Sequence, residues 1–574
     1  MNIEQALQLA FQHLNNGNLM AAAPLFNSIL QREPRNFAAL NGRGFVELQQ
    51  NHLHQSAADF AASLSINPQQ VFAQKMLAIV LGAMGRFEES AQAFESAIKL
   101  DPKDPEIYFN RANFRYQVGN AVLALKDLDE AIRLKPSYLE ARSNRANLLI
   151  LQDAFAAAEK DLVYLTDKVK NNPDLWVALG FARHKLGKHK EALQCNERAL
   201  KLNPQHPDAL MNNSSITFDL QDFVPAVMWA EKAISVTPNR AEAHYSLAKA
   251  LAELAYFERA LESYNQAVML NPNYAEAFMG RGLVNAAMRR AEAAEADYDR
   301  AIALKPDYED AIFNKSYMHL EQHSFVDGWR GYDRRLGFPK FTDSLLPDLP
   351  IWQGQPFEGR LLVRGEQGLG DQIIFASVLP ELLERHSQVC LQIEPRLVPL
   401  FERSFPSITV LPKTNTQPED IVAQIPLGSL PKFFRQSAQD FAAATIPYLK
   451  ADSQKTSVFK QAMAPNGQRI VGINWRSFKN RYADEKSIQL EDLLPIFQIP
   501  GCVFINLQYG DVKKEIAAAA TKGIKFSEAI SIDLTNDIDG VASLVEACDD
   551  IVSISNSTVH IAGALGKPVL LMLP

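Results

Sequence analysis

Residues Asp101 to Pro136 read DPKDPEIYFNRANFRYQVGNAVLALKDLDEAIRLKP and contain one full unit of a pattern that recurs along the first part of the chain. Pro102 and Pro136 lie 34 residues apart, and further prolines stand at 34, 68, 204, 238, 272 and 306, each separated by 34 residues or twice that number. A fixed period of this length is typical of repeat proteins. The sequence therefore predicts a long array of similar units.

Two positions of the unit carry only Ala, Gly or Ser. The first reads Ala10, Gly44, Ala78, Ala112, Ala146, Gly180, Ser214, Ala248 and Gly282, and the second reads Ala22, Ser56, Ser90, Ala124, Ala158, Ala192, Ala226, Ala260 and Ala294. Small side chains let two helices approach closely, and a proline ends the helix that precedes it. Each unit is therefore predicted to form a helical hairpin whose two helices touch at these positions.

The array resembles the tetratricopeptide repeat in its period, its small positions and its proline, over about residues 3–308. A degenerate tenth unit follows, with Ser316, Gly328 and Tyr332 at the equivalent positions. Such units bury their apolar faces against their neighbours. The resemblance implies an all-α superhelix with a concave groove for a protein or peptide partner.

Asparagines recur on the first helix of several units, the helix that lines the groove in proteins of this kind. They are Asn110, Asn113, Asn144, Asn147, Asn212 and Asn314. An amide both donates and accepts hydrogen bonds, which suits the backbone of an extended peptide. The alternative is that exposed helix positions tolerate asparagine at low cost. Similar arrays in protein-modifying sugar transferases favour the peptide groove.

Composition limits the classes of function. The chain has 574 residues, of which 47% are hydrophobic and 22% charged, so more than one folded domain is expected. The net charge of −8 excludes the basic excess that nucleic acid or an anionic membrane requires. Because long apolar stretches and a leader pattern are absent from the sequence, we expect a cytoplasmic protein without an integral membrane segment.

The pattern changes after the array at 1–338. A proline-rich and aromatic linker at 339–359 is predicted to lead into short apolar runs that alternate with helix-length stretches, at 361–363, 389–393, 408–411, 470–473, 503–507, 551–554 and 569–573. This alternation predicts parallel sheets covered by helices, with ligands at the carboxyl ends of the strands. We expect two Rossmann-like halves at 360–452 and 470–574, joined by a linker at 453–469.

One glycine-rich stretch, RGEQGLGDQIIFAS at 364–377, lies where the first of these strands ends. Gly365, Gly368 and Gly370 are expected to supply positive φ angles and room for a ligand, and Asp371 opens a helix. Asp371 is a candidate for chemistry, and the alternative is a plain N-cap.

The second stretch, SISNSTVHIAGALGKPVLLMLP at 553–574, places several hydroxyl and amide side chains at the start of a helix. A helix N-terminus of this kind suits the diphosphate of a nucleotide sugar. His560 on that helix is either a functional group or a packed core histidine.

Several ordered motifs, IWQGQPFEGRLLVRGEQGLGDQIIFA, IPLGSLP at 425–431, GINWRS at 472–477 and STVHIAGALGKPV at 557–569, resemble the bacterial tetratricopeptide-repeat glycosyltransferases. That family is related to heptosyltransferases and, more remotely, to O-linked N-acetylglucosamine transferases. The resemblance implies a GT-B fold and metal-independent, inverting transfer of a hexosyl or heptosyl group, with no cofactor. It also implies an acceptor half that contains Asp371 as the general base and a donor half for the nucleotide sugar.

The donor-binding residues that this resemblance implies lie in the last third of the chain. They are Arg476, Lys486, Gln508, Ser555, Asn556, Ser557, Thr558 and His560. Lys486 precedes a Ser-Ile pair and is expected to contact phosphate, as an alternative to membership of a solvated basic loop, and Gln508 is expected to read the nucleotide base. The triplet Asp537 to Asp539 has the spacing of a metal-binding motif, but we interpret it as turn and capping chemistry, without a metal site.

Two departures from the family leave an alternative open. Ser555 and Asn556 stand where relatives carry an Asp-Thr pair. No helices follow the last strand, so we expect either a shortened donor half or a truncated sequence. A non-catalytic scaffold that binds protein through its repeats, with a degenerate transferase-like domain, fits these departures. Transfer to a glycan or a lipid-linked acceptor is a third interpretation. The donor, the acceptor and the oligomeric state are not determined by the sequence.

Overall fold

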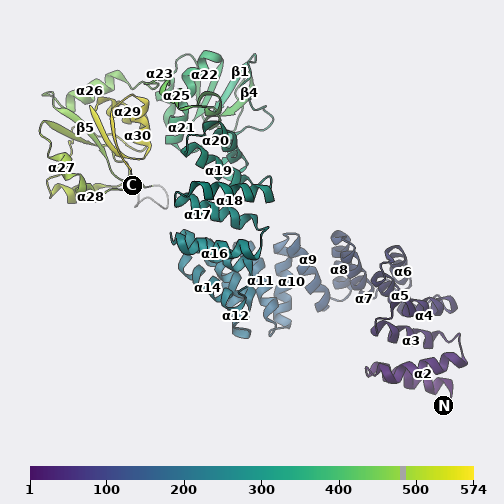
Figure 1. Ribbon diagram of the computed structural model, residues 1–574. Coiled ribbons are helices and arrows are strands. Elements are labelled where there is room, and N and C mark those ends of the chain that lie inside the picture. Colours follow the sequence, from purple (N-terminus) through teal and green to yellow (C-terminus); the bar gives the residue numbers. More distant parts are fainter. Residues whose placement is uncertain (479–486, 574) are drawn as a thin grey trace. The chain divides into compact units, whose positions relative to one another are not determined.

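The structure is a computed structural model, and it describes residues 1–478 and 487–573. The chain forms two compact units, Met1–Asn271 and Pro272–Pro574. Figure 1 shows the helical hairpins of the first unit and the hairpins and parallel strands of the second. We refer to them as unit 1 and unit 2.

Unit 1 consists of consecutive helical hairpins, as the 34-residue period predicts. The hairpins are α1 (Ile3–Asn15) with α2 (Leu19–Arg32), α3 (Phe37–Gln49) with α4 (Leu53–Ile66), α5 (Val71–Ala83) with α6 (Phe87–Leu100), α7 (Pro105–Gln117) with α8 (Ala121–Leu134), α9 (Leu139–Leu151) with α10 (Phe155–Lys168), α11 (Pro173–Lys185) with α12 (His189–Leu202), α13 (Pro207–Asp219) with α14 (Phe223–Val236), and α15 (Ala241–Glu253) with α16 (Phe257–Leu270). Where a repeat proline follows, the second helix ends two residues before it, as at Arg32 before Pro34. Helix α10 ends at the equivalent position, Lys168, although Lys170 replaces the proline there.

The two small positions meet inside each hairpin. All of their residues are buried, and at three hairpins a serine joins one position to the other. The Ser56 hydroxyl donates to the Gly44 carbonyl at 2.7 Å, and the Ser90 hydroxyl donates to the Ala78 carbonyl at 2.7 Å. The prediction that the helices touch at these positions is confirmed, because no larger side chain would leave room for such bonds.

The turn inside each hairpin has a residue with a left-handed backbone at the same place in the repeat. In unit 1 these residues are Gly17, Asn51, Gly85, Gly119, Asp153, Gly187, Gln221 and Ala255. A glycine adopts this conformation without strain, whereas a residue with a Cβ atom adopts it at a conformational cost. The turn is therefore set by the hairpin geometry and not by its own sequence.

Unit 2 begins with the remaining hairpins of the array. They are α17 (Ala275–Ala287) with α18 (Ala291–Leu304), and α19 (Glu309–Glu321) with the shorter α20 (Phe325–Tyr332), after which the chain continues in 3-10 turns η1 (Asp333–Gly337) and η2 (Pro339–Ser344). Ser316, Gly328 and Tyr332 are buried in this last hairpin. The boundary between compact units thus falls inside the array, upstream of the boundary at residue 338 that the sequence indicates.

The first sheet of unit 2 is parallel and has the strand order β3-β2-β1-β4. Its strands are β1 (Arg360–Arg364), β2 (Val389–Ile393), β3 (Thr409–Pro412) and β4 (Ile421–Pro426); its helical segments are α21 (Leu369–Phe375), η3 (Ala376–Val378), α22 (Leu379–Arg385), η4 (Pro395–Leu397), α23 (Val398–Ser404), η5 (Leu427–Ser429), α24 (Pro431–Phe434) and α25 (Ala438–Ala442). The sequence predicted β1, β2 and β3 but not β4.

The second sheet is also parallel, with the strand order β6-β5-β7-β8. Its strands, all predicted, are β5 (Arg469–Asn474), β6 (Cys502–Asn506), β7 (Asp550–Ile554) and β8 (Val569–Met572); its helical segments are η6 (Leu490–Leu493), α27 (Leu494–Phe497), α28 (Lys513–Ala520), α29 (Ile538–Ala547) and α30 (Ser557–Ala564). A hydrophobic cluster that includes Val363 and Ile393 of the first sheet and Ile551 and Ala562 of the second packs the two parts together.

The segment between the sheets is not an extended linker. Residues 453–463 form helix α26 (Ser453–Met463), which has Asp452 as its N-cap, and this helix packs against α29. The Thr456 hydroxyl donates to the Ser543 carbonyl at 3.4 Å. The predicted linker at 453–469 is therefore in large part a covering helix of the second sheet.

Candidate functional site

The glycine-rich stretch lies at the point of the first sheet where the chain reverses its direction of strand addition. Strands β2 and β3 lie on one side of β1, and β4 lies on the other. Ligands of open parallel sheets bind at the carboxyl ends of the strands at such a point. The loop after β1, residues 365–370, which we call the glycine loop, and the loop after β4 both lie there.

The glycines of this loop provide close approach and not positive φ angles, which corrects the sequence-based expectation. The residue with a left-handed backbone is Gln367, at φ 63°, and none of Gly365, Gly368 and Gly370 is among the residues with positive φ in the described part of the chain. A Cβ atom at Gly365 would lie 2.4 Å from Gln372 Oε1. The loop is therefore tightly packed against its own helix.

Asp371 lies in the first turn of α21, two residues beyond the N1 position. Its Oδ2 accepts the backbone N–H of Gly368 at 2.9 Å, so Gly368 is the N-cap and Asp371 completes the cap from within the helix. The carboxylate is half-buried. Asp371 is therefore not the N-cap residue, but its carboxylate caps α21 from the N3 position, as the capping alternative predicts.

The second motif lies at the equivalent point of the second sheet, between β5 and β7. Asn556 is the N-cap of α30 and accepts the Thr558 N–H at 3.0 Å. Its amide donates to Asn474 Oδ1 at 2.5 Å, and the fully buried Asn474 donates to the Leu507 carbonyl at 3.0 Å. Asn474 was not predicted from the sequence, although it could have been found as the polar residue that ends β5.

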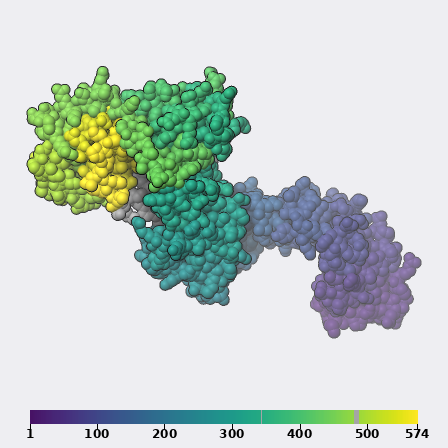
Figure 2. Space-filling model, turned by 45° about the horizontal axis from the view of Figure 1, so that its top comes forward, coloured from purple at the N-terminus to yellow at the C-terminus, as the bar shows by residue number. Residues whose placement is uncertain are grey.

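The two motifs are in direct contact. Helices α21 and α30 pack together, and a Cβ atom at Gly370 would lie 2.8 Å from His560 Cδ2 and 3.6 Å from Ser557 Oγ. A residue larger than glycine would therefore clash at position 370, where α21, which follows β1, meets the first turns of α30, which follows β7. The structure brings Asp371, Ser557 and His560 together, while Ser555 lies exposed beside them. Figure 2 shows the yellow C-terminal segment at the surface of unit 2.

His560 is half-buried on α30. Burial lowers the pKa of its imidazole, and the negative charge of Asp371 opposes that shift. The ring is therefore neutral at pH 7, and one of its nitrogens can donate a hydrogen bond while the other accepts one. A neutral imidazole beside a carboxylate can orient a hydroxyl group or contact a phosphate.

Arg476 follows β5 and Gln508 follows β6. Both side chains are bound to other residues of the protein. Arg476 Nη1 lies 3.4 Å from Glu515 Oε2, with its side chain 42% exposed. Gln508 is buried, accepts the N–H groups of Trp475 at 3.1 Å and Arg476 at 2.6 Å, and donates to the carbonyls of Arg476 and Tyr509. Its amide has no donor or acceptor left for a base, so the predicted contact does not match its position. Gln508 holds the loop after β5 instead.

Lys486 lies outside the described residues. The residue that follows it, Ser487, accepts the backbone N–H of Ser477 at 3.0 Å through its hydroxyl. This contact lies just beyond the carboxyl end of β5.

The acidic triplet before α29 has structural roles. Asp537 is the N-cap of α29 and accepts the Gly540 N–H at 2.8 Å, as the capping interpretation predicts. Asp539 is ion-paired with Arg403 and, at 3.1 Å, with Lys455. Within residues 1–478 and 487–573, no group of three or more His, Cys, Asp or Glu side chains is arranged to hold a metal ion.

Four of the groove asparagines lie on α7 and α9 of unit 1. Asn144 Nδ2 donates to Asn113 Oδ1 at 2.8 Å, while Asn110 is half-buried. Asn113, Asn144 and Asn147 line a cavity of about 230 Å³ whose other walls are Ala112, Tyr116, Leu128, Leu148 and Leu151. Amide groups and apolar side chains therefore share one recess.

The other two asparagines differ. Asn212 lines a cavity of about 380 Å³ together with Phe181, His206 and Arg240. Asn314, in unit 2, donates to the Asp310 carbonyl of its own helix at 2.7 Å.

Among the helices that the structure describes, none is long and apolar enough to cross a membrane.

Models of the tetratricopeptide repeat match residues 7–71, 80–119, 173–206 and 245–309. Protein FlbA of Caulobacter vibrioides is 32% identical over 269 residues, which cover 43% of this chain and 45% of FlbA. Tetratricopeptide repeat protein 6 of Homo sapiens is 27% identical over 199 residues, which cover 34% of this chain and 38% of that protein. This chain thus spans less than half the length of either curated relative.

A crystal structure of a tetratricopeptide repeat protein from Parabacteroides merdae is 17% identical, covers 43% of this chain and 98% of its own, and has a TM-score of 0.31. The family matches show that the chain contains tetratricopeptide repeats. They support a scaffold role for these repeats in protein interaction.

Proposed function

We propose that unit 2 is a glycosyltransferase of the GT-B type, which moves a sugar from a nucleotide-sugar donor to an acceptor selected by the repeats, in the cytoplasm. The observation that carries the proposal is the contact between α21 and α30 at Gly370 and His560. It puts a half-buried carboxylate beside a helix N-terminus at the carboxyl ends of two parallel sheets. This arrangement supports the proposal, because the reaction needs a base for the acceptor hydroxyl and an anion site for the leaving diphosphate.

In the proposed reaction Asp371 acts as the general base. It takes the proton of the acceptor hydroxyl as that oxygen forms a bond to the anomeric carbon, and the bond from this carbon to the diphosphate oxygen breaks with its electron pair going to the diphosphate. Attack from the side opposite the leaving group inverts the anomeric centre, and no metal takes part. A base of this kind contributes about 10² to 10⁴ in rate.

The leaving diphosphate needs positive potential. The first turn of α30 offers free N–H groups and the positive end of the helix dipole, and the Ser557 hydroxyl lies in that turn. Arg476 and Lys486 follow β5 in sequence and are the cations proposed to join the site when a donor binds. His560, kept neutral by burial, can donate to a phosphate oxygen.

We further propose that the acceptor is a protein segment bound by unit 1. The recess at Asn113, Asn144 and Asn147 combines amide groups with an apolar floor, which suits an extended peptide. Substitution of Asn113 and Asn147 by alanine is expected to slow transfer to protein. Unchanged turnover in that variant indicates a glycan or lipid-linked acceptor.

The second candidate is a scaffold without catalytic activity. It is favoured by Ser555 and Asn556, which supply no carboxylate near α30, and by the internal bonding of Gln508. In that case the repeats bind protein and the sheets have a structural role.

Radiolabelled nucleotide sugars and the full chain distinguish these functions. Asp371→Asn is expected to reduce transfer about 10² to 10⁴ fold, whereas Asp420→Asn is expected to be neutral. Asp420 is a matched control because it is exposed and has a left-handed backbone that asparagine tolerates. Equal activity of wild type and Asp371→Asn would remove Asp371 as the base. Absence of calorimetric binding to every nucleotide sugar in the panel would favour the scaffold.

A further inference from the structure

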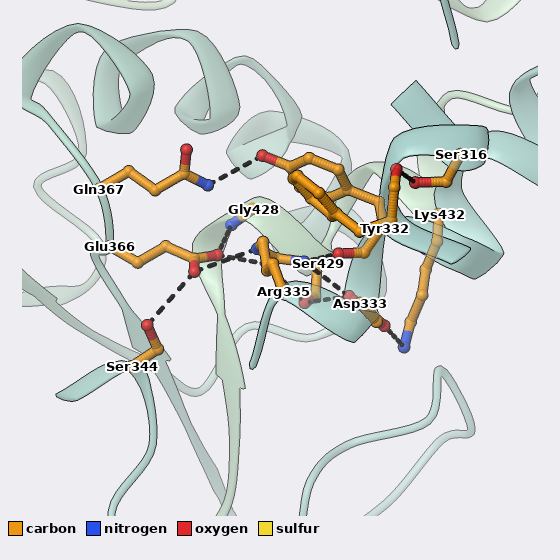
Figure 3. Close-up of polar contacts among 11 residues, drawn as sticks. Ser316, Tyr332, Asp333, Arg335, Ser344, Glu366, Gln367, Gly428, Ser429 and Lys432 are labelled. Carbon is orange, nitrogen blue, oxygen red and sulfur yellow. Dashed lines mark hydrogen bonds and ion pairs between the residues drawn. The ribbon is translucent and has the colours of Figure 1, made fainter. Parts of the chain in front are cut away.

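An arginine at the end of the helical array is buried beside the glycine loop. Arg335 of η1 has no exposed surface, and its guanidinium uses all five N–H donors. Nε donates to Glu366 Oε2 at 3.2 Å, Nη2 to Glu366 Oε1 and, at 2.9 Å, to the Ser429 hydroxyl, and Nη1 to the Tyr332 carbonyl at 3.1 Å and to Asp333 Oδ1 at 3.0 Å. Figure 3 shows Arg335 between Glu366 and Asp333.

Glu366 belongs to the glycine loop and is saturated in the same way. Besides Arg335, its carboxylate accepts the Gly428 N–H at 3.0 Å and the Ser344 hydroxyl at 3.3 Å. Gly428 and Ser429 lie in the loop after β4. This ion pair therefore joins η1, which directly follows the last hairpin, to both loops at the carboxyl ends of the strands.

A second contact reaches the next residue of the glycine loop. Gln367 Nε2 donates to the Tyr332 hydroxyl at 2.8 Å, and the Arg335 guanidinium lies 4.3 Å from the centre of the Tyr332 ring. Gln367 is the residue held at φ 63°, a conformation that costs a side-chain-bearing residue free energy. Tyr332, which contacts Arg335, is thus hydrogen-bonded to the residue of the loop whose backbone is strained.

The burial of both charges indicates what the pair does. The side chains of Arg335 and Glu366 are both fully shielded from solvent. The desolvation of two such charges offsets most of their attraction, so a buried pair contributes little stability compared with neutral side chains of similar size. It fixes geometry, because each charge tolerates only a narrow arrangement of partners.

We propose that Arg335 is a positioning residue: with Glu366 it anchors the glycine loop to the last helical hairpin and thereby sets the place of Asp371. The inference rests on the transfer reaction proposed above only for its effect on turnover. The anchoring itself concerns the loop and stands apart from that reaction.

Amide exchange of the full chain tests the anchoring. Arg335→Met leaves the Glu366 charge buried without its partner, so unit 2 is expected to unfold at lower denaturant concentration and exchange in peptides that cover 365–371 to rise at least tenfold. Arg335→Met with Glu366→Gln removes both charges but keeps an acceptor for the Gly428 N–H. This double variant is expected to regain most of the stability and to keep the fast exchange of the glycine loop.

A purely structural role gives a different result. If the ion pair only stabilises the fold, loop protection returns together with stability in the double variant, and the proposal is overturned. Arg330→Met is the matched control, because Arg330 lies on α20, is 74% exposed and pairs with Asp327 of the same helix. It is expected to change neither stability nor exchange.

Turnover gives a second measurement, because a loss of fold stability alone would not lower kcat at an unchanged KM. In the double variant, kcat is expected to fall at least tenfold while the KM for the donor stays within twofold, since the donor is bound by the second sheet. A wild-type chain that transfers no sugar refutes the proposed function, but the exchange result still decides the role of Arg335. Normal kcat with a disordered loop refutes the link to Asp371 and leaves the transferase in place.

Discussion

Unit 1 and the glycine loop of unit 2 use the same device, a missing side chain that lets two segments approach closely. In the hairpins a Cβ atom at Gly180 would lie 2.6 Å from Asn196 Oδ1, and in unit 2 a Cβ atom at Gly370 would lie 2.8 Å from His560 Cδ2. The hairpin contact recurs every 34 residues and is made within one repeat. The contact at Gly370 occurs once and joins segments far apart in the chain. In this chain, the small residues that recur with the repeat allow the helices of a hairpin to pack. The isolated Gly370 instead lies at the candidate site.

The largest expected effect is on the periodic contact. Ala158→Leu adds three carbons at a position with no exposed surface, and such overpacking costs about 3 kcal/mol of local stability. Hydrogen exchange in α9, α10 and α11 is expected to rise accordingly. Ala157→Leu, on the same helix but exposed, is the control. Similar exchange in both variants would break the comparison, because the small positions would then not determine the packing.

A change in the contact at Gly370 is expected to lower the rate of sugar transfer. Gly370→Ala forces α21 and α30 apart, and a displacement of this size lowers transfer about tenfold or more. Gly563→Ala is the control, since a Cβ atom there meets nothing within 4 Å and alanine favours the helix. Turnover of a nucleotide sugar by each variant gives the measurement. Full activity of Gly370→Ala would show that the contact between the sheets is not part of the site.

A smaller effect is expected at the turns of the hairpins. Ala255 has a backbone φ of 58°, so Ala255→Gly is expected to stabilise unit 1 by about 1 kcal/mol, because glycine adopts this conformation without strain. Ala252→Gly, inside α15, is expected to destabilise it by a similar amount. Chemical denaturation followed in unit 1 compares the two. Changes of the same sign would contradict a role for the turn geometry.

The smallest effect concerns the titration of His560. Burial lowers its pKa below the ordinary value of 6.5, and Asp371 opposes this shift, so Asp371→Asn is expected to lower the pKa further. In the wild type, the unfolded chain holds the His560 proton more tightly than the folded chain does. The free energy of unfolding is therefore kept above pH 6.5 and is lost as the pH falls from there through the folded pKa. A carbon-13 NMR titration of the full chain measures the shift, with the histidines of unit 1 as internal controls. An unchanged pKa would mean that the two groups do not interact.

The sequence predicted the features that are local. The proline and the small positions recur with a period that is visible without any knowledge of distant contacts, and most strands are runs of apolar residues. Strand β4 was missed because the polar Gln424 interrupts its run. In the structure, the buried amide of Gln424 is hydrogen-bonded to the backbone of Leu346 and Leu349. These partners are distant in the sequence, so no local pattern predicts the contact.

The candidate site could be predicted only in part, for the same reason. Asp371, Asn556 and His560 belong to motifs that can be read one at a time, and the structure adds that they lie together. From the sequence, the positive φ was assigned to the glycines, because a left-handed backbone at a glutamine such as Gln367 has no local sequence signal. The pairing of Arg335 with Glu366 joins residues 31 positions apart that carry no shared motif.

The place of the last hairpin has a consequence for how such chains can evolve. Since α20 and η1 supply Tyr332 and Arg335 to the sheet domain, a gene rearrangement that begins at the first strand would leave the buried Glu366 without its counter-ion. Repeats can be gained or lost upstream, where one hairpin resembles the next. The final hairpin must instead be inherited together with the sheets, as part of a single heritable module.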